Sequence, residues 1–498
     1  IGRISPDSMI QDAVVPRSRL PEVLGAAYDI ASRYELRLAN VFHAGDGNLH
    51  PLICFDSRFA DQVRRVKDAG RELMEVCVRA GGTITGEHGV GLDKRELLPL
   101  VFSDADMNVM LSVRAAFDPL GLCNPGKIVP LLRGCGEGKA VQTTPPTSLR
   151  TQEPLRSAPI APVSRTDTSL AQIVGEQNIS SNVIFPGSTE EIAEILRLAS
   201  RERWNVVPAG GMTWLKPQHQ TAANLIVSTS RLNQIIEHEP ADLIAIAQAG
   251  VKLVDFNTKL KENGQWLPLD PADDGRATIG GVVATGLGGA QQFGYGRPRG
   301  SVIGMKVVMA DGSVIKAGGR VVKNVAGYDL CKLFTGSYGT LGVITEVNFK
   351  LRPRPAREAT VIVTGATGDL VSNARRIMDA RLFPVAAEIV SPAFANRLGI
   401  TSTDPALLVR FAGNEKGVAY QVEEALAQLS RAEVMLDDTQ LWQAVAAVSL
   451  SSNRDEIGEV WQMGALDARK ALRPATSLMY RVKQQLDPLN ILPQINAD

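Results

Sequence analysis

Three of the five histidines of this chain lie in two short glycine-rich stretches, which suggests a metal-centred active site. His43 and His50 belong to HAGDGNLH, and His88 directly follows Glu87 in GEHGVG. Two imidazoles and one carboxylate with an open position form a common catalytic zinc or manganese arrangement. We therefore expect His43, His50 and Glu87 to bind a metal ion, and His88 to act as the general base.

The residues around the first stretch predict a β-hairpin. RLANVFH and LHPLICF are β-prone, and Gly45-Asp46-Gly47 between them supplies turn chemistry. His43 and His50 would flank this hairpin and face each other across the paired strands, where Cβ atoms lie roughly 4.5 to 5.5 Å apart. That separation would let both imidazoles converge on one ion.

Glu87 and His88 are neighbours, and adjacent residues of a regular strand point to opposite faces. Both can reach one site only if the glycines at 86, 89 and 91 bend the chain. In the alternative interpretation, each histidine caps a turn or satisfies a buried polar group.

Composition is that of a globular protein of about three domains, with 498 residues and 44% hydrophobic content. The formal net charge is zero, which gives no electrostatic reason to expect binding to nucleic acid or to an anionic membrane. The five cysteines show no CxxC spacing, as is typical of reduced thiols in a cytoplasmic protein. No apolar run approaches about 18 residues, and no signal peptide is recognisable. We interpret the chain, which begins at Ile1, as a fragment.

Helix signals occur in two separate parts of the chain. An amphipathic pattern spans 59–80, and Ser103 with Asp106 forms a capping-box start for a second helix. Ser188 with Glu191 marks another helix start, and strands alternate with glycine turns beyond it. These patterns predict an α+β fold.

Residues 131–170 are rich in Pro, Thr, Ser and Arg, without apolar periodicity, and are expected to form a linker between two units. Four glycine-rich clusters lie in the second unit, at 208–213, 278–289, 323–330 and 336–345. Glycine has no side chain to cover its backbone N–H group, so such loops can bind a diphosphate closely. One dinucleotide that contacts all four loops would therefore account for the four clusters. Independent structural turns would account for them as well, and the Rossmann fingerprint is missing.

Residues 176–354 resemble the FAD-binding domain of the vanillyl-alcohol oxidase flavoprotein superfamily, the PCMH type. Within it, LDPADDGRATIGGVVATGLGG, VVKNVAGYDL and FTGSYGTLGVITEV resemble the FAD-binding E subunit of bacterial glycolate dehydrogenase, also called glycolate oxidase. GRISPD, VFHAGDGNLHPLI, GGTITGEHGVG and AFDPLGLCNPGKIVP resemble the C-terminal cap of the D subunit. D-lactate and D-2-hydroxyglutarate dehydrogenases have the same cap.

The resemblance implies an α+β chain in four parts. These are a D-like FAD-linked oxidase C-terminal cap at 1–130, an antiparallel sheet with helices; the linker at 131–170; an E-like PCMH-type FAD-binding domain at 171–354; and a shortened E-type cap at 355–498. The D-like cap lacks an FAD domain upstream of it, so its histidine cluster would be half of a site. A fused reading frame with its beginning missing would give this order.

The resemblance also assigns residues. It implies that His43, His50 and Glu87 are metal ligands, that His88 is the catalytic base, and that Asn124 lies near flavin or substrate. It implies FAD contacts at Gly210, Gly211, Thr213, Thr278, Gly280, Gly281, Thr285, Gly286, Gly339 and Ile344. Some relatives carry a histidine that bonds covalently to the flavin at or near the position of Met212. Methionine cannot form this bond, so FAD is expected to bind noncovalently here.

The implied activity is FAD-dependent oxidation of a small D-2-hydroxy acid, glycolate to glyoxylate foremost, within a multi-subunit dehydrogenase. Electrons would leave through an iron-sulfur subunit. The protein would lie in the cytoplasm, or at the inner membrane through its partner subunits. Two alternatives stay open: a noncatalytic flavin-binding subunit for electron transfer or structure, and an enzyme similar to D-lactate dehydrogenase.

Overall fold

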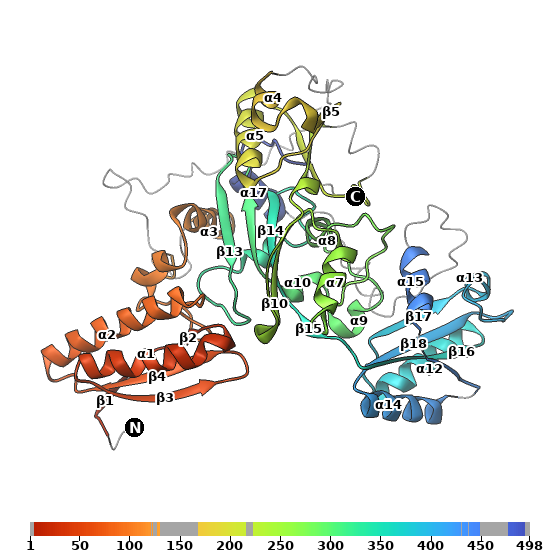
Figure 1. Cartoon of the computed structure of the whole chain (residues 1–498), viewed down its shortest axis with the longest axis horizontal. Helices are drawn as coiled ribbons and strands as arrows, with labels where there is room; N and C mark the ends of the chain where they lie inside the picture. Colours follow the sequence, from red (N-terminus) through yellow and green to blue (C-terminus); the bar gives the residue numbers. More distant parts are fainter. Residues whose placement is uncertain are drawn as a thin grey trace.

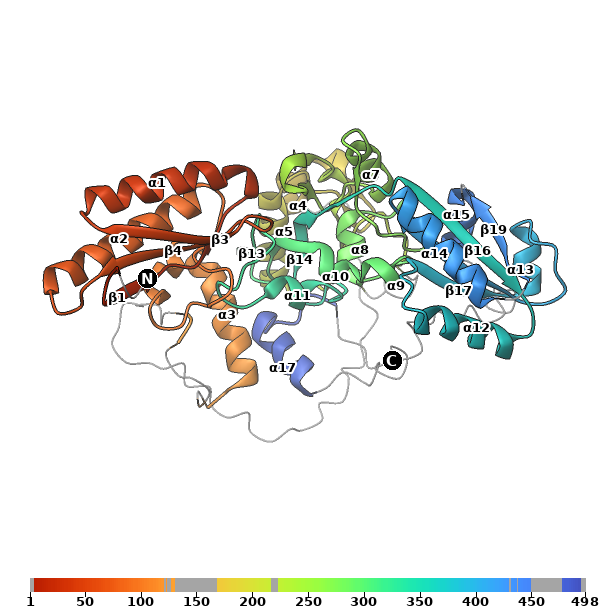
Figure 2. The same cartoon turned by 90° about the horizontal axis from the view of Figure 1, so that it is seen from below.

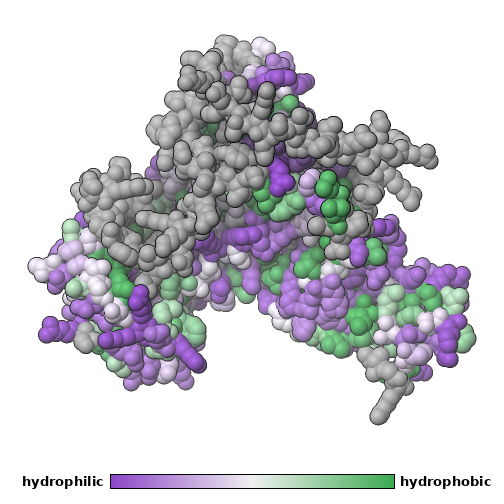
Figure 3. Space-filling view, turned by 180° about the vertical axis from the view of Figure 1, so that it is seen from behind, coloured by the Kyte–Doolittle hydropathy of each residue, from purple (hydrophilic) through white to green (hydrophobic). Residues whose placement is uncertain are grey.

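The computed structural model describes residues 4–120, 122, 127–129, 168–215, 223–429, 431–436, 438–448 and 477–493. The expected α+β class is confirmed: an N-terminal unit (4–129) and a C-terminal unit (355–448) lie on opposite sides of a central unit (168–354), as Figures 1 and 2 show. Seen from behind in Figure 3, a hollow separates the two lateral units below the central one. Most of the expected linker lies outside the described residues.

The N-terminal unit is an antiparallel sheet packed against two helices (Figure 1). Strand β4 is central, with β3 on one edge and β1 and β2 on the other. Its elements are β1 (Asp7–Ile10), β2 (Ala13–Val14), η1 (Arg17–Arg19), α1 (Leu20–Arg33), β3 (Arg37–His43), β4 (Asn48–Phe55), α2 (Ala60–Arg79), η2 (Arg95–Leu100) and α3 (Asp104–Phe117). The predicted hairpin and both predicted helices are confirmed, and Ser103 and Asp106 form the capping box.

The central unit contains a small sheet of order β5-β6-β8-β7 and a five-stranded antiparallel sheet of order β13-β12-β14-β10-β9. Ser188 caps α5 by accepting the N–H of Glu191, as predicted. The small sheet and the helices beside it are α4 (Thr168–Val174), η3 (Glu176–Asn178), β5 (Ile179–Ser180), β6 (Val183–Ile184), α5 (Thr189–Glu202), β7 (Val206–Ala209), β8 (Leu225–Ser228) and η4 (Thr229–Arg231).

Short helices and loops surround the larger sheet of the central unit. Its elements are β9 (Ile235–Glu239), η5 (Pro240–Asp242), β10 (Ile244–Gln248), α7 (Leu253–Lys261), β11 (Gln265–Trp266), α8 (Ile279–Thr285), α9 (Gln292–Tyr295), α10 (Pro298–Ser301), β12 (Val302–Val308), β13 (Val314–Gly318), α11 (Leu330–Phe334), β14 (Val343–Lys350) and β15 (Arg352–Pro353). Strand β11 pairs only with β15 among the described strands.

The C-terminal unit is an antiparallel sheet of order β17-β18-β16-β19 with apolar side chains buried on both faces. One face packs on α12 and α14, and the other packs on α13, α15 and Ala290 of the central unit. The elements are β16 (Arg357–Thr364), α12 (Thr367–Asp379), β17 (Ala386–Val390), α13 (Pro392–Arg397), β18 (Ala406–Gly413), α14 (Glu415–Gln428), β19 (Glu433–Leu436) and α15 (Thr439–Val448).

Helix α17 (Ser477–Leu486) does not join the C-terminal sheet, although we expected residues 355–498 to form one E-type cap. It packs on α3 of the N-terminal unit instead. Val482 and Leu486 are buried in a core that runs without interruption from the N-terminal unit into the central unit. No helix in the described part of the chain is long and apolar enough to span a membrane.

Candidate metal and flavin site

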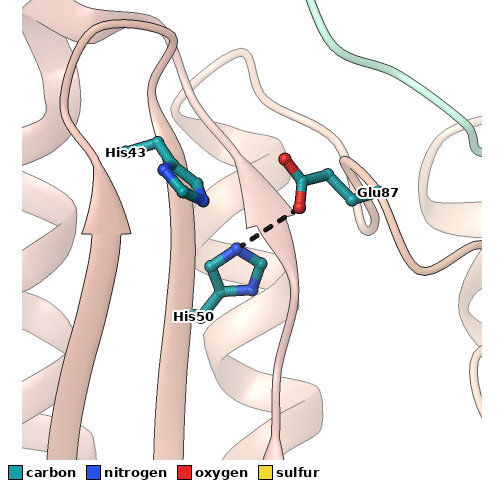
Figure 4. A group of neighbouring side chains, drawn as sticks. All are labelled: His43, His50 and Glu87. Carbon is teal, nitrogen blue, oxygen red and sulfur yellow. Dashed lines mark ion pairs between the residues drawn. The ribbon is translucent and has the colours of Figure 1, made fainter.

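Two histidines of the β3–β4 hairpin and one glutamate of a later loop point toward one another (Figure 4). One ligand atom from each of His43, His50 and Glu87 lies within 4.8 Å of the others. Nε2 of His50 lies 3.8 Å from Oε2 of Glu87, and the two side chains are 12% and 38% exposed. The three predicted ligands therefore come together at a partly open site, and their donor set fits zinc or manganese.

The two histidines are diagonal neighbours, which corrects the expectation that they face each other directly. The strand register pairs His43 with Asn48 and His50 with Val41, because the turn between the strands contains only residues 44–47. Their ring centroids lie 5.5 Å apart at an interplanar angle of 88°. Diagonal neighbours on one face of a sheet stay within reach of long side chains, so the imidazoles still converge.

One buried carboxylate holds the loop that carries Glu87 and His88. Asp12 is 0% exposed, and its Oδ2 accepts hydrogen bonds of 2.6 to 3.0 Å from the Thr85 hydroxyl and from three successive backbone N–H groups, those of Gly86–His88. Burial alone would raise the pKa of Asp12, but these donors hold it below its usual value. An ionised carboxylate bonded in this way fixes the path of the loop.

The same loop brings His88 against His50. Their rings are stacked, with centroids 5.2 Å apart and planes inclined by 28°. Gly89 has a φ of +80° and Gly91 a φ of +55°, so the expected glycine bend is confirmed. At Gly86, an added Cβ would lie 2.3 Å from the Val14 side chain. Glu87 and His88 therefore reach one site although they are adjacent in sequence.

A lysine from the central unit completes the surroundings of this cluster. Nζ of Lys323 lies 2.6 Å from Oε1 of Glu87 and 2.7 Å from a carboxylate oxygen of Asp46. The bond from Lys323 holds the pKa of Glu87 below its usual value, and the two carboxylates raise the pKa of Lys323 to about 12. Sequence reasoning missed both Lys323 and Asp12. An aspartate inside the apolar stretch MIQDAVVP was the available signal for Asp12, because a buried charge needs partners.

Three of the four glycine-rich clusters lie together in the central unit. The close contacts that join them pair Gly210 with Thr278, Gly211 with Arg276, Gly286 with Gly336, and Gly339 with Pro208. An added Cβ at Gly210 would lie only 2.0 Å from Oγ1 of Thr278, so glycine is required there for backbone approach. Tight packing between these loops therefore explains part of this glycine content.

Two hydroxyls in these loops suit a polar ligand. Oγ1 of Thr213 and Oγ of Ser337 are buried and have no hydrogen-bond partner among the described residues. Buried polar atoms are normally bonded, and the neighbouring glycines leave backbone N–H groups accessible. The loops therefore fit a dinucleotide such as FAD. The hydroxyls of Thr278 and Thr285 are engaged with the backbone at Gly281, within α8 and its cap.

Other predicted FAD contacts face protein. An added Cβ at Gly280 would lie 2.6 Å from the Ala249 side chain, and Ile344 is 6% exposed within the core. Asn124 lies outside the described residues. The fourth glycine-rich cluster, 323–330, contacts the N-terminal unit, since the N–H of Val325 donates to the carbonyl of Thr85 at 3.4 Å. Contact between units thus accounts for this cluster.

Comparison with known families gives a match for the N-terminal unit and another for the central unit. Residues 1–128 match the family described as FAD linked oxidases, C-terminal domain, and residues 180–318 match the family described as FAD binding domain. Together with the relatives below, these matches show that the chain belongs to the FAD-linked oxidoreductases.

Within that class, the chain is similar to proteins named glycolate oxidase subunit GlcD. It is 46% identical to the protein of Escherichia coli K12 over 137 residues, 28% of each chain, and 31% identical to that of Bacillus subtilis over 333 residues, 64% of this chain and 68% of the relative. The chain thus spans little more than a quarter of the Escherichia coli relative. Among solved structures, alkyldihydroxyacetonephosphate synthase aligns with a TM-score of 0.48 and 18% identity, over 62% of this chain and 75% of the other.

Proposed function

We propose that this chain carries out the FAD-dependent oxidation of a small D-2-hydroxy acid, foremost glycolate to glyoxylate. The convergence of His43, His50 and Glu87 beside His88 carries the proposal. Relatives named glycolate oxidase subunits support the choice of substrate. The central unit, which contains the FAD-binding match, packs directly on the unit that holds the cluster.

The residues divide the chemistry between binding and proton transfer. A bound zinc or manganese ion supplies Lewis-acid polarisation of the substrate, and noncovalently bound FAD supplies the hydride acceptor. His43, His50 and Glu87 would hold the ion, and Thr213 and Ser337 would donate to FAD. His88 would take the hydroxyl proton, because it is exposed beside the ligands and its loop is fixed by Asp12.

We further propose that electrons leave through an iron-sulfur partner subunit. Iron-sulfur clusters need closely grouped thiolates, whereas the cysteines among the described residues, Cys54, Cys77 and Cys331, are buried on different elements, β4, α2 and α11. The sequence resemblance supports an assembly in which a D-like cap is joined to an E-like flavin domain.

Activity of the purified chain with glycolate, D-lactate and an artificial electron acceptor tests the proposal. His88→Ala should lower kcat by 10²- to 10⁴-fold without changing bound FAD, which is measured by its absorbance. His238→Ala is the matched control, because His238 bonds Gln265 in the central unit, and it should keep the wild-type rate. An unchanged rate in His88→Ala contradicts the role of His88. Bound FAD that no hydroxy acid reduces, even after partner subunits are added, favours the noncatalytic alternative.

A further inference from the structure

Lys323 belongs to the central unit but contacts two carboxylates of the N-terminal unit. It follows β13 and precedes α11, and its ammonium group lies between Asp46 in the hairpin turn and Glu87 in the Gly86–His88 loop. These partners are 277 and 236 residues away in sequence. Because Lys323 is 34% exposed, water screens the pair only in part, and its charge acts on the cluster.

The two oxygens of Glu87 have different neighbours. Oε1 lies against Lys323, whereas Oε2 faces Nε2 of His50. A divalent ion held by Glu87 would therefore share one carboxylate with the lysine. Two cations on one carboxylate repel each other, which weakens ion binding. The ion pair with Lys323 also holds the Glu87 side chain in place, but this helps ion binding less than the repulsion harms it, because Glu87 is partly exposed.

We propose that Lys323 is a built-in competitor that sets the divalent-cation affinity of the His43, His50 and Glu87 cluster. The inference rests on the proposed function only in treating this cluster as a cation site. Coupling between two binding events is reciprocal, so a bound ion weakens the hold of Lys323 on Glu87 by the same factor by which Lys323 weakens the ion. Occupation of the site would thus loosen the contact between the central and N-terminal units.

Calorimetric titration of the full chain with Zn²⁺ and with Mn²⁺ at low ionic strength tests the inference. Lys323→Met, which removes the charge and keeps most of the stem, should bind each ion about tenfold more tightly than wild type. Lys323→Arg keeps the charge and should bind within about twofold of wild type. Lys332→Met is the matched control, because Lys332 pairs with Asp329 on the same unit, and it should also match wild type.

Each outcome has a definite meaning. Unchanged or weaker binding in Lys323→Met, with wild type binding the ion, overturns the competitor role and leaves the proposed metal site intact. Absence of binding in wild type and all variants overturns both. Hydrogen exchange gives a second measure: in wild type, Mn²⁺ should speed exchange at the amide of Val325, which bonds Thr85 across the same contact. No change, or a change that persists in Glu87→Gln, contradicts the inference.

Discussion

Asp12 and Glu388 are both almost completely buried carboxyl groups, 0% and 2% exposed, yet their surroundings shift their pKa values in opposite directions. Four donors on one oxygen hold the pKa of Asp12 below its usual value. Glu388 has an oxygen without a partner among the described residues, and burial, followed by the nearby charge of Asp270, raises its pKa to about 8. Hydrogen-bond donors, and not burial by itself, decide which carboxyl is charged.

The same contrast separates the two contacts of the central unit. Toward the N-terminal unit it uses ionised pairs, such as Lys323 with Glu87. Toward the C-terminal unit, α9 packs on β17, and burial raises the pKa of Asp270 to about 7 near Glu388. The first contact should respond to salt, and the second to pH.

Asp12→Ala should have the largest effect on stability. It leaves three backbone N–H groups, that of the buried Gly86 among them, without their acceptor and should lower the free energy of unfolding by about 3 kcal/mol. Cation binding at the cluster should be lost as well, since the loop of Glu87 is released. Urea unfolding and cation titration measure the two effects. Asp61→Ala removes an exposed carboxylate of α2 as a control, and an equal loss of stability in both variants contradicts the role of Asp12.

Glu388→Gln should have an intermediate effect that depends on pH. The folded-state pKa of Glu388 is raised to about 8, so between about pH 4.5 and 8 the unfolded state releases a proton that the folded state keeps. Wild-type stability therefore falls across this window. Glutamine removes the loss, and the variant should be more stable than wild type at about pH 8 and nearly equal to it at about pH 4.5.

Urea unfolding at both pH values tests this expectation. Glu423→Gln, on the exposed face of α14, serves as the control and should not alter the pH dependence. A stability curve of Glu388→Gln that remains parallel to wild type would show that Glu388 does not stay protonated in the folded chain.

Ser18→Ala should have the smallest effect of the three. The hydroxyl of Ser18 donates to Asp242 at 2.7 Å across the contact between the N-terminal and central units, while the Ser18 backbone N–H donates to the same carboxylate at 2.9 Å. One remaining bond limits the loss to about 1 kcal/mol in urea unfolding. Ser372→Ala, whose hydroxyl bonds only within α12, should cost less. A larger loss in Ser372→Ala than in Ser18→Ala would show that the Ser18 hydroxyl does not stabilise the contact between the N-terminal and central units through Asp242.

Local features of the site could be predicted from the sequence, because short-range signals determine them. The hairpin, the capping box of α3 and the glycine bend after His88 all depend on residues within a few positions of one another. The diagonal placement of His43 and His50 could not be predicted, since it depends on where pairing begins beside the turn.

Long-range partners could not be read from the sequence. The loop at Glu87 is fixed by Asp12, 75 residues earlier, and its charge is balanced by Lys323, 236 residues later. Composition failed in a related way at the glycine-rich clusters. Three of them meet in the central unit, but the cluster at 323–330, which contains one glycine, serves a contact between units.

The packing of α17 on α3 has a consequence for how the chain is made. During synthesis, α3 emerges about 360 residues before the helix that covers it, so its apolar side stays uncovered by α17 while those residues are translated. Val482 and Leu486 close the shared core only when they leave the ribosome. The N-terminal unit therefore completes its core only after the much later segment that contains α17 has been translated.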